Sequence, residues 1–243
     1  MSENQVERTL QSKQEIMIKE VNQDECTFRA DREIVMIAVR QNGLALQYAS
    51  DTLRNDRDIV MVAVKQHGYA LYYVSETLQN DRDIVMAAVR QNGLALQYAS
   101  EVLRNDREIV MIAVRQNGCA LDVASAALRY DRDIVMAAVM QNGLSLEYAS
   151  RTASALMHGH RKIVLTTKES THDMSVCLRN DHEIVMAAVR QNGCALQYAS
   201  KTLQADHGIV MTAVSQNGYA LRDASETLRN DREIVIAKWT CLV

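Results

Sequence analysis

Proline is absent from this 243-residue chain, and glycine occurs only nine times. Because these two residues most often interrupt regular secondary structure, their scarcity predicts helices joined by short turns. Aromatic residues make up 5% of the chain although 48% of it is hydrophobic. The apolar side chains are therefore mainly Ala, Val, Ile, Leu and Met, which suit closely packed helices.

Long apolar runs, excess charge and cysteine are also scarce. No apolar run approaches the ~20 residues that span a membrane, and the polar start has no signal-peptide core. The net charge of −3 gives no strong field to attract nucleic acid or an acidic membrane. An odd, sparse set of cysteines fits a reducing compartment, so we expect a cytoplasmic protein without disulfides or a membrane partner. The cysteines are Cys26, Cys119, Cys177, Cys194 and Cys241.

A 25-residue unit recurs along most of the chain. Residues 31–50 read DREIVMIAVRQNGLALQYAS, and the leading Asp31 returns 25 residues later (56 − 31). The gap from Asp131 to Asp181 is twice as long. A fixed period of this size is typical of solenoids. The sequence therefore predicts an all-α fold, an α-solenoid of stacked 25-residue helix-pair repeats.

Each unit is expected to contain two helices. Asp31 is a suitable N-cap, and Ile34, Val35, Ala38 and Val39 form one apolar face. Gly43 is expected to end this helix in the left-handed conformation. The first helix then covers about 32–42, and a second runs from 44 to 53. Helices this short are marginal alone, so stacking on the next unit must stabilise them.

The repeat pattern divides the chain into four parts. Residues 1–30 form a degenerate N-terminal repeat, 31–150 five regular repeats, 151–180 a degenerate repeat with an insertion, and 181–243 two and a half repeats. Polar residues 166–168 stand where the first helix elsewhere packs. We therefore expect a hinge or bulging loop between two firmer blocks, 31–150 and 181–236. Compensating frameshifts and ordinary divergence both remain open as its origin.

The consensus string D-R-E-I-V-M-x-A-V-R-Q-N-G-x-A-L-x-Y-A-S-x-x-L-R-N resembles the repeat called domain of unknown function 4116. The resemblance covers 31–150 and 181–236 well, and 9–30 and 160–180 poorly. It implies a helical repeat array with no assigned activity.

No motif points to catalysis. The recurrent glycines stand alone and form no phosphate-binding loop. His158 and His160 match no zinc-site spacing, and Cys119 and Cys194 lie three units apart, too far for a disulfide. We expect no catalytic residue, cofactor or metal, and therefore no enzyme.

Two rows of recurring residues are candidate partner-binding sites. The first row consists of aromatic rings that either pack on the core or face a partner: Tyr48, Tyr73, Tyr98, Tyr148 and Tyr198. The second consists of cations near helix ends, where the helix dipole alone also favours them: Arg40, Lys65, Arg90, Arg115 and Arg190.

Two functions fit these rows. The first is a non-catalytic scaffold that binds protein or peptide partners through its periodic surface. The alternative is a helical-repeat nucleic-acid binder that uses the Arg rows, including a second row that begins at Arg54. The acidic net charge and the lapses at Met140 and Ser215 favour the scaffold. Apolar Trp239 near the C-terminus suggests end-to-end self-association as well.

Overall fold

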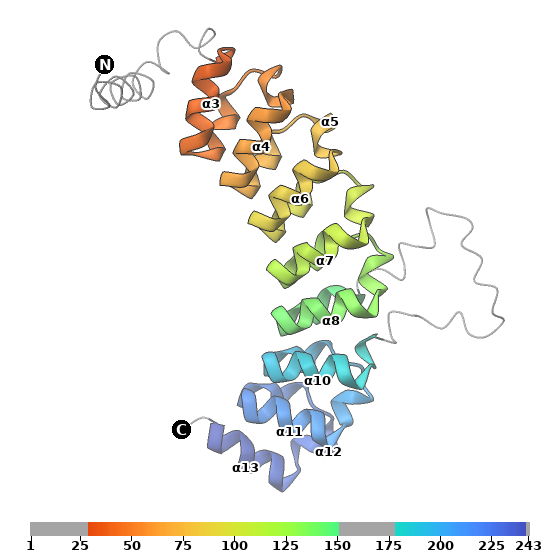
Figure 1. The fold of residues 1–243 in the computed structure, drawn as a ribbon. Helices are drawn as coiled ribbons and strands as arrows, with labels where there is room; N and C mark the ends of the chain where they lie inside the picture. Colours follow the sequence, from red (N-terminus) through yellow and green to blue (C-terminus); the bar gives the residue numbers. More distant parts are fainter. Residues whose placement is uncertain (1–28, 151–177, 242–243) are drawn as a thin grey trace, which may run out of the picture.

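The computed structural model describes residues 29–150 and 178–241. In these ranges each unit begins with a ten-residue α-helix, and these helices lie side by side in one curved row (Figure 1). They are α3 (Arg32–Gln41), α4 (Arg57–Gln66), α6 (Arg82–Gln91), α7 (Arg107–Gln116), α8 (Arg132–Gln141), α10 (His182–Gln191), α11 (His207–Gln216) and α13 (Arg232–Cys241). The predicted all-α solenoid is confirmed.

An aspartate starts each of these helices, as predicted. Oδ1 of Asp56 accepts hydrogen bonds from the backbone N–H of Asp58 and Ile59 at 3.0 and 3.2 Å. These bonds satisfy two of the free donors at the start of α4. The predicted apolar face is also buried: in α4 it consists of Ile59, Val60, Ala63 and Val64, each with no exposed surface.

The recurrent glycine has a different role from the predicted one. None of Gly43, Gly68, Gly93, Gly118, Gly143 and Gly193 has a φ in the left-handed region, so that prediction is wrong. A Cβ at Gly68 would lie 2.6 Å from the carbonyl oxygen of Ala88 in the next unit. Glycine is needed because two backbones approach closely here. Larger residues at Gly93 would meet the Ala113 carbonyl in the same way.

The predicted second helix is also wrong as a continuous element. A 3-10 helix takes its first half: η1 (Gly43–Tyr48), η3 (Gly68–Tyr73), η4 (Gly93–Tyr98), η6 (Gly118–Val123), η8 (Gly143–Ser150), η9 (Gly193–Tyr198) and η11 (Gly218–Asp223). A single short turn usually follows: η2 (Leu53–Asn55), α5 (Glu76–Gln79), η5 (Leu103–Asn105), η7 (Leu128–Tyr130), η10 (Leu203–Ala205) or α12 (Glu226–Arg229).

Contacts with the preceding unit interrupt this second half. Ala99 is extended, with φ −74° and ψ 155°. The next N–H, that of Ser100, donates to the carbonyl of Gln79 one unit back at 3.0 Å. The Ser100 hydroxyl donates to Oδ1 of Asn80 at 2.6 Å. The recurrent serine thus joins neighbouring units, in addition to capping the short turn that follows it.

The units form two layers. The ten-residue α-helices of neighbouring units contact one another from α3 to α13, and the longer 3-10 helices that begin at the recurrent glycine do so from η1 to η11. Each α-helix also packs on the 3-10 helix of the preceding unit, as α4 does on η1. The core lies between the layers and runs through all described units.

The unit of α8 packs directly on the unit of α10. Arg132 Nε bonds Asp181 Oδ2 at 3.0 Å across 49 positions, whereas Arg107 bonds Asp131 at 2.8 Å across 24. Arg179 reaches the Glu147 carbonyl 32 positions back, whereas Arg54 reaches that of Gln47 seven back. Both offsets grow by 25 (49 − 24 and 32 − 7), the length of one unit.

Residues 178–180 therefore complete the α8 unit, and the stack is continuous across this point. The hinge alternative is wrong, because α8 and α10 contact each other as α7 and α8 do, whereas the alternative of a bulging loop falls on residues outside the described ranges. The degenerate repeats predicted at 1–30 and 151–180 fall almost wholly outside the described residues.

Deletion of residues 151–175 should leave the array folded. It joins Ser150 to Val176 and restores the 25-residue spacing from Asp131 to Asp181. Because α8 already packs on α10, we expect a thermal midpoint within a few degrees of the intact chain's. As a control, deletion of 106–130 also keeps the phase but removes a packed unit and should lower the midpoint. Loss of helical circular dichroism in the first variant, with the second still folded, would contradict the direct packing.

Candidate partner-binding surface

The solvent-facing side of the α-helices, here called the outer α-face, is lined by the positions equivalent to Arg32, Met36, Ile37 and Arg40. In α4 these are Arg57, Met61, Val62 and Lys65, of which the two apolar side chains are half-buried and the two cations exposed. The face therefore has an apolar centre between two lines of cations.

The predicted cation row lies at the C-terminal ends of the α-helices. All of its members are exposed, and none of their side chains makes a hydrogen bond or ion pair with another described residue. They are Arg40, Lys65, Arg90, Arg115 and Arg190. Negative partial charge on the last carbonyls of each helix stabilises a cation at this position. These charges remain available to an anionic partner.

The second line of cations lies at the N-terminal ends of the α-helices, and its arginines from Arg32 to Arg132 are already paired with carboxylates of the next unit. Its Nε–carboxylate distances run from 2.8 to 3.2 Å, in the pairs Arg32–Asp56, Arg57–Asp81, Arg82–Asp106, Arg107–Asp131 and Arg132–Asp181. Each Arg also bonds the acidic residue two positions later, as Arg107 does with Asp133 at 2.6 Å. We call this series of ion pairs the arginine ladder, and it ends where His182 and His207 replace the Arg.

The ladder lowers the pKa of the capping aspartates. Partial burial raises the pKa of Asp106, but hydrogen bonds from the Ile109 N–H and from Arg82 outweigh it and leave the pKa below its usual value. Asp56, Asp81, Asp131 and Asp181 have lowered pKa values as well. These aspartates are thus held in the charged form that caps the helix.

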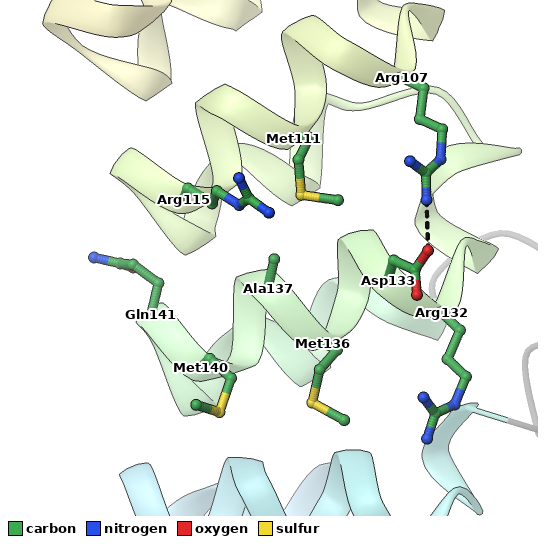
Figure 2. A pocket seen from close by; sticks show the side chains of 9 residues that line it. All are labelled: Arg107, Met111, Arg115, Arg132, Asp133, Met136, Ala137, Met140 and Gln141. Carbon is green, nitrogen blue, oxygen red and sulfur yellow. Dashed lines mark hydrogen bonds and ion pairs between the residues drawn. The ribbon is translucent and has the colours of Figure 1, made fainter.

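An open groove of about 740 Å³ lies between α7 and α8 on the outer α-face. Figure 2 shows Met111 of α7 and Ala137 of α8 pointing toward each other, whereas Met136 and Met140, which also line the groove, extend from the edge of α8 that faces α10. Arg115 and Gln141 stand at the C-terminal end of the groove, and Arg107 and Asp133 at the N-terminal end. The groove thus offers an apolar floor with one unpaired cation.

The predicted tyrosine row lies in the other layer, at the ends of the 3-10 helices, and does not join the cation row. Tyr73, Tyr98, Tyr148 and Tyr198 are half-buried against the core, whereas Tyr48 is 52% exposed. Four of the five rings in this row thus contribute to packing on the core.

Two tyrosines that the row did not include form a local aromatic cluster. The rings of Tyr69 and Tyr72 lie 6.1 and 5.1 Å from that of Tyr98. Burial, and then the neighbouring phenols, raise the pKa of Tyr98. The sequence could have indicated this cluster, because Tyr69 and Tyr72 differ from the repeat consensus. The equivalent positions in the next unit hold Leu94 and Gln97.

The remaining candidates are structural. In the second Arg row, Arg54 donates to the carbonyls of Ala49 and Gln47 at 3.0 and 3.1 Å. Arg129 and Arg179 each donate to one carbonyl at 3.3 Å, whereas the Nε of Arg104 is buried without a partner among the described residues. The Gln of the Gln-Asn-Gly motif accepts from the glycine N–H of the preceding unit, as Gln116 does from Gly93 at 2.6 Å.

The described residues contain no group of three or more His, Cys, Asp or Glu side chains placed to hold a metal ion. His158 and His160 lie outside them. Within 29–150 and 178–241, the helices are too short or too polar to cross a membrane.

Arg82→Gln should lower the free energy of unfolding at neutral pH. A depressed pKa of Asp106 contributes stability above the unfolded pKa, about 3.9, which is lost as the pH falls through the folded value. The difference from wild type should therefore shrink below about pH 4 and in high salt. Urea unfolding at several pH values measures this.

Arg232→Gln is the matched control, because Arg232 has no carboxylate partner among the described residues. An equal effect of both substitutions would show that the ladder contributes nothing.

Comparison with known proteins identifies the family. A family model described as "Domain of unknown function (DUF4116)" matches residues 31–79, 81–129, 124–152, 172–204 and 206–237. No curated protein matches the chain, and neither does any solved structure. Because the matches cover more than half of the sequence, the chain belongs to the DUF4116 family, a repeat family of unknown function.

Proposed function

We propose that this protein is a non-catalytic scaffold that binds acidic protein or peptide partners along its outer α-face. The observation that carries the proposal is the exposed cation row, which extends over α3, α4, α6, α7 and α10 without a carboxylate partner among the described residues. An acidic segment that crossed the stack would meet one cation on each of these helices.

The apolar centre of the outer α-face supports a protein partner. Half-buried methionines recur beside the cations, among them Met36, Met61, Met111, Met136 and Met186. Methionine is flexible and polarisable, so it adapts to side chains of different shapes. A continuous stack of such units offers an extended surface, as solenoids generally do.

Nucleic-acid binding remains the alternative, with less support. It needs many cations that contact phosphates, and Arg54, Arg129 and Arg179 of the second Arg row already donate to backbone carbonyls. A net charge of −3 also opposes it.

The proposal includes a reducing, cytoplasmic setting, in which Cys119 and Cys194 stay as the free thiols of this structure. It also includes end-to-end self-association through α13, where Ile236 is 53% and Trp239 63% exposed. Trp239→Glu should then reduce any rise in sedimentation coefficient with concentration. An unchanged rise would refute the role of this surface.

The double substitution Arg90→Glu and Arg115→Glu should abolish partner binding. Partners captured on the immobilised protein should be acidic, released by salt and resistant to nuclease, and the double variant should lose them. The control, Lys201→Glu with Arg229→Glu, changes the net charge equally at exposed positions off the row and should keep them. Equal capture by both double variants would overturn the proposal, and loss of partners on nuclease treatment would favour the nucleic-acid alternative.

A further inference from the structure

We propose that the groove between α7 and α8 sets the register of the partner, by binding one apolar side chain between two carboxylates of an acidic segment. This inference rests on the proposed function. It goes beyond it by naming where along the stack a segment is held and which side-chain pattern is recognised.

Met140 interrupts the cation row and lines this groove from the edge of α8 that faces α10. It occupies the position that Arg40, Lys65, Arg90 and Arg115 occupy in the preceding units, and 65% of it is exposed. Burying an exposed apolar side chain against a partner is favourable, whereas leaving it in water contributes nothing. Met140 is thus an apolar contact site within the cation row.

Cations stand on both sides of Met140 only because of the way the stack is built. α8 packs between α7 and α10, which brings Arg115 on one neighbour and Arg190 on the other to the same side. In sequence Arg190 lies 50 positions from Met140 (190 − 140). The order along the outer α-face is therefore cation, methionine, cation.

The charges that line the groove determine where a carboxylate goes. Arg107 is bonded to Asp131 and Asp133, and Arg132 to Asp181 and Glu183. Arg115 is the lining cation with no carboxylate partner among the described residues. A carboxylate therefore binds at the Arg115 end, and the apolar group lies over Met111, Met136 and Met140.

Helix spacing fixes the pattern of the partner. Neighbouring helices pack about 9 Å apart, and a polyproline II segment advances about 3.1 Å per residue with three residues per turn. Side chains about three residues apart in such a segment therefore lie on the same face, one step of the stack apart. The recognised pattern is acidic, two spacers, apolar, two spacers, acidic.

Designed peptides test this pattern. Each is a Gly-Ser chain with a reporting dye and a side chain at every third position. The reference carries Glu at all six such positions. Two test peptides replace one Glu with Phe, at the fifth position or, to allow the opposite chain direction, at the second. At low salt, one Phe peptide should bind the full-length protein about tenfold more tightly than the reference.

Met140→Arg restores the residue found at this position in other units, so the fold is retained. It should abolish the preference for Phe or reverse it. Ser215→Arg is the matched control, because it adds the same charge at the other lapse in the row, on α11, and should leave the preference intact. A wild-type protein that does not distinguish the peptides, or a preference that survives Met140→Arg, would overturn the register.

The two proposals fail in different ways. If all three peptides bind equally and Arg90→Glu with Arg115→Glu releases them, the scaffold stands and the register is wrong. If no peptide binds in a way that depends on these two cations, both are wrong.

Discussion

The close approach of two backbones in successive units is the constraint on which the rest of the structure depends. The recurrent glycine faces the carbonyl of an alanine in the next α-helix, with no room for a Cβ between them. At Gly68 the N–H also donates to Oε1 of Gln91, at 2.6 Å. The small side chain of alanine lets the helices pack closely, and the missing Cβ of glycine leaves space for the carbonyl oxygen. The glutamine side chain accepts a hydrogen bond from the glycine N–H. These three residue types recur because each unit forms the same contact with the next.

Short elements become stable through this contact. A ten-residue α-helix and a six-residue 3-10 helix would each be marginal alone. Stacking places Ile, Val, Leu and Ala side chains in one core that runs from unit to unit. The serine–asparagine bonds and the arginine ladder add polar contacts between the same neighbours. The energetics of such an array are local, since each unit depends mainly on the two that it touches.

The outer α-face is free of this constraint, and there the sequence varies. The last-turn position holds Arg, Lys, Met or Ser in different units without a change in the helix. Tyr69 and Tyr72 likewise stand where other units have Leu or Gln, on the 3-10 layer. An array with a repeated core can thus have a surface on which individual units differ. Such differences can determine at which units a partner binds.

The sequence by itself determined the period, the start of each α-helix and its buried face, because capping and apolar spacing act within a few residues. It also placed the cation row on exposed helix ends. Only the tertiary structure decided the remainder. The second helix is interrupted because Ser100 and its equivalents bond the preceding unit, and the glycines are required by a neighbour's carbonyl rather than by their own φ. The packing of α8 on α10 depends on which surfaces meet, and the order of residues along the chain does not specify that.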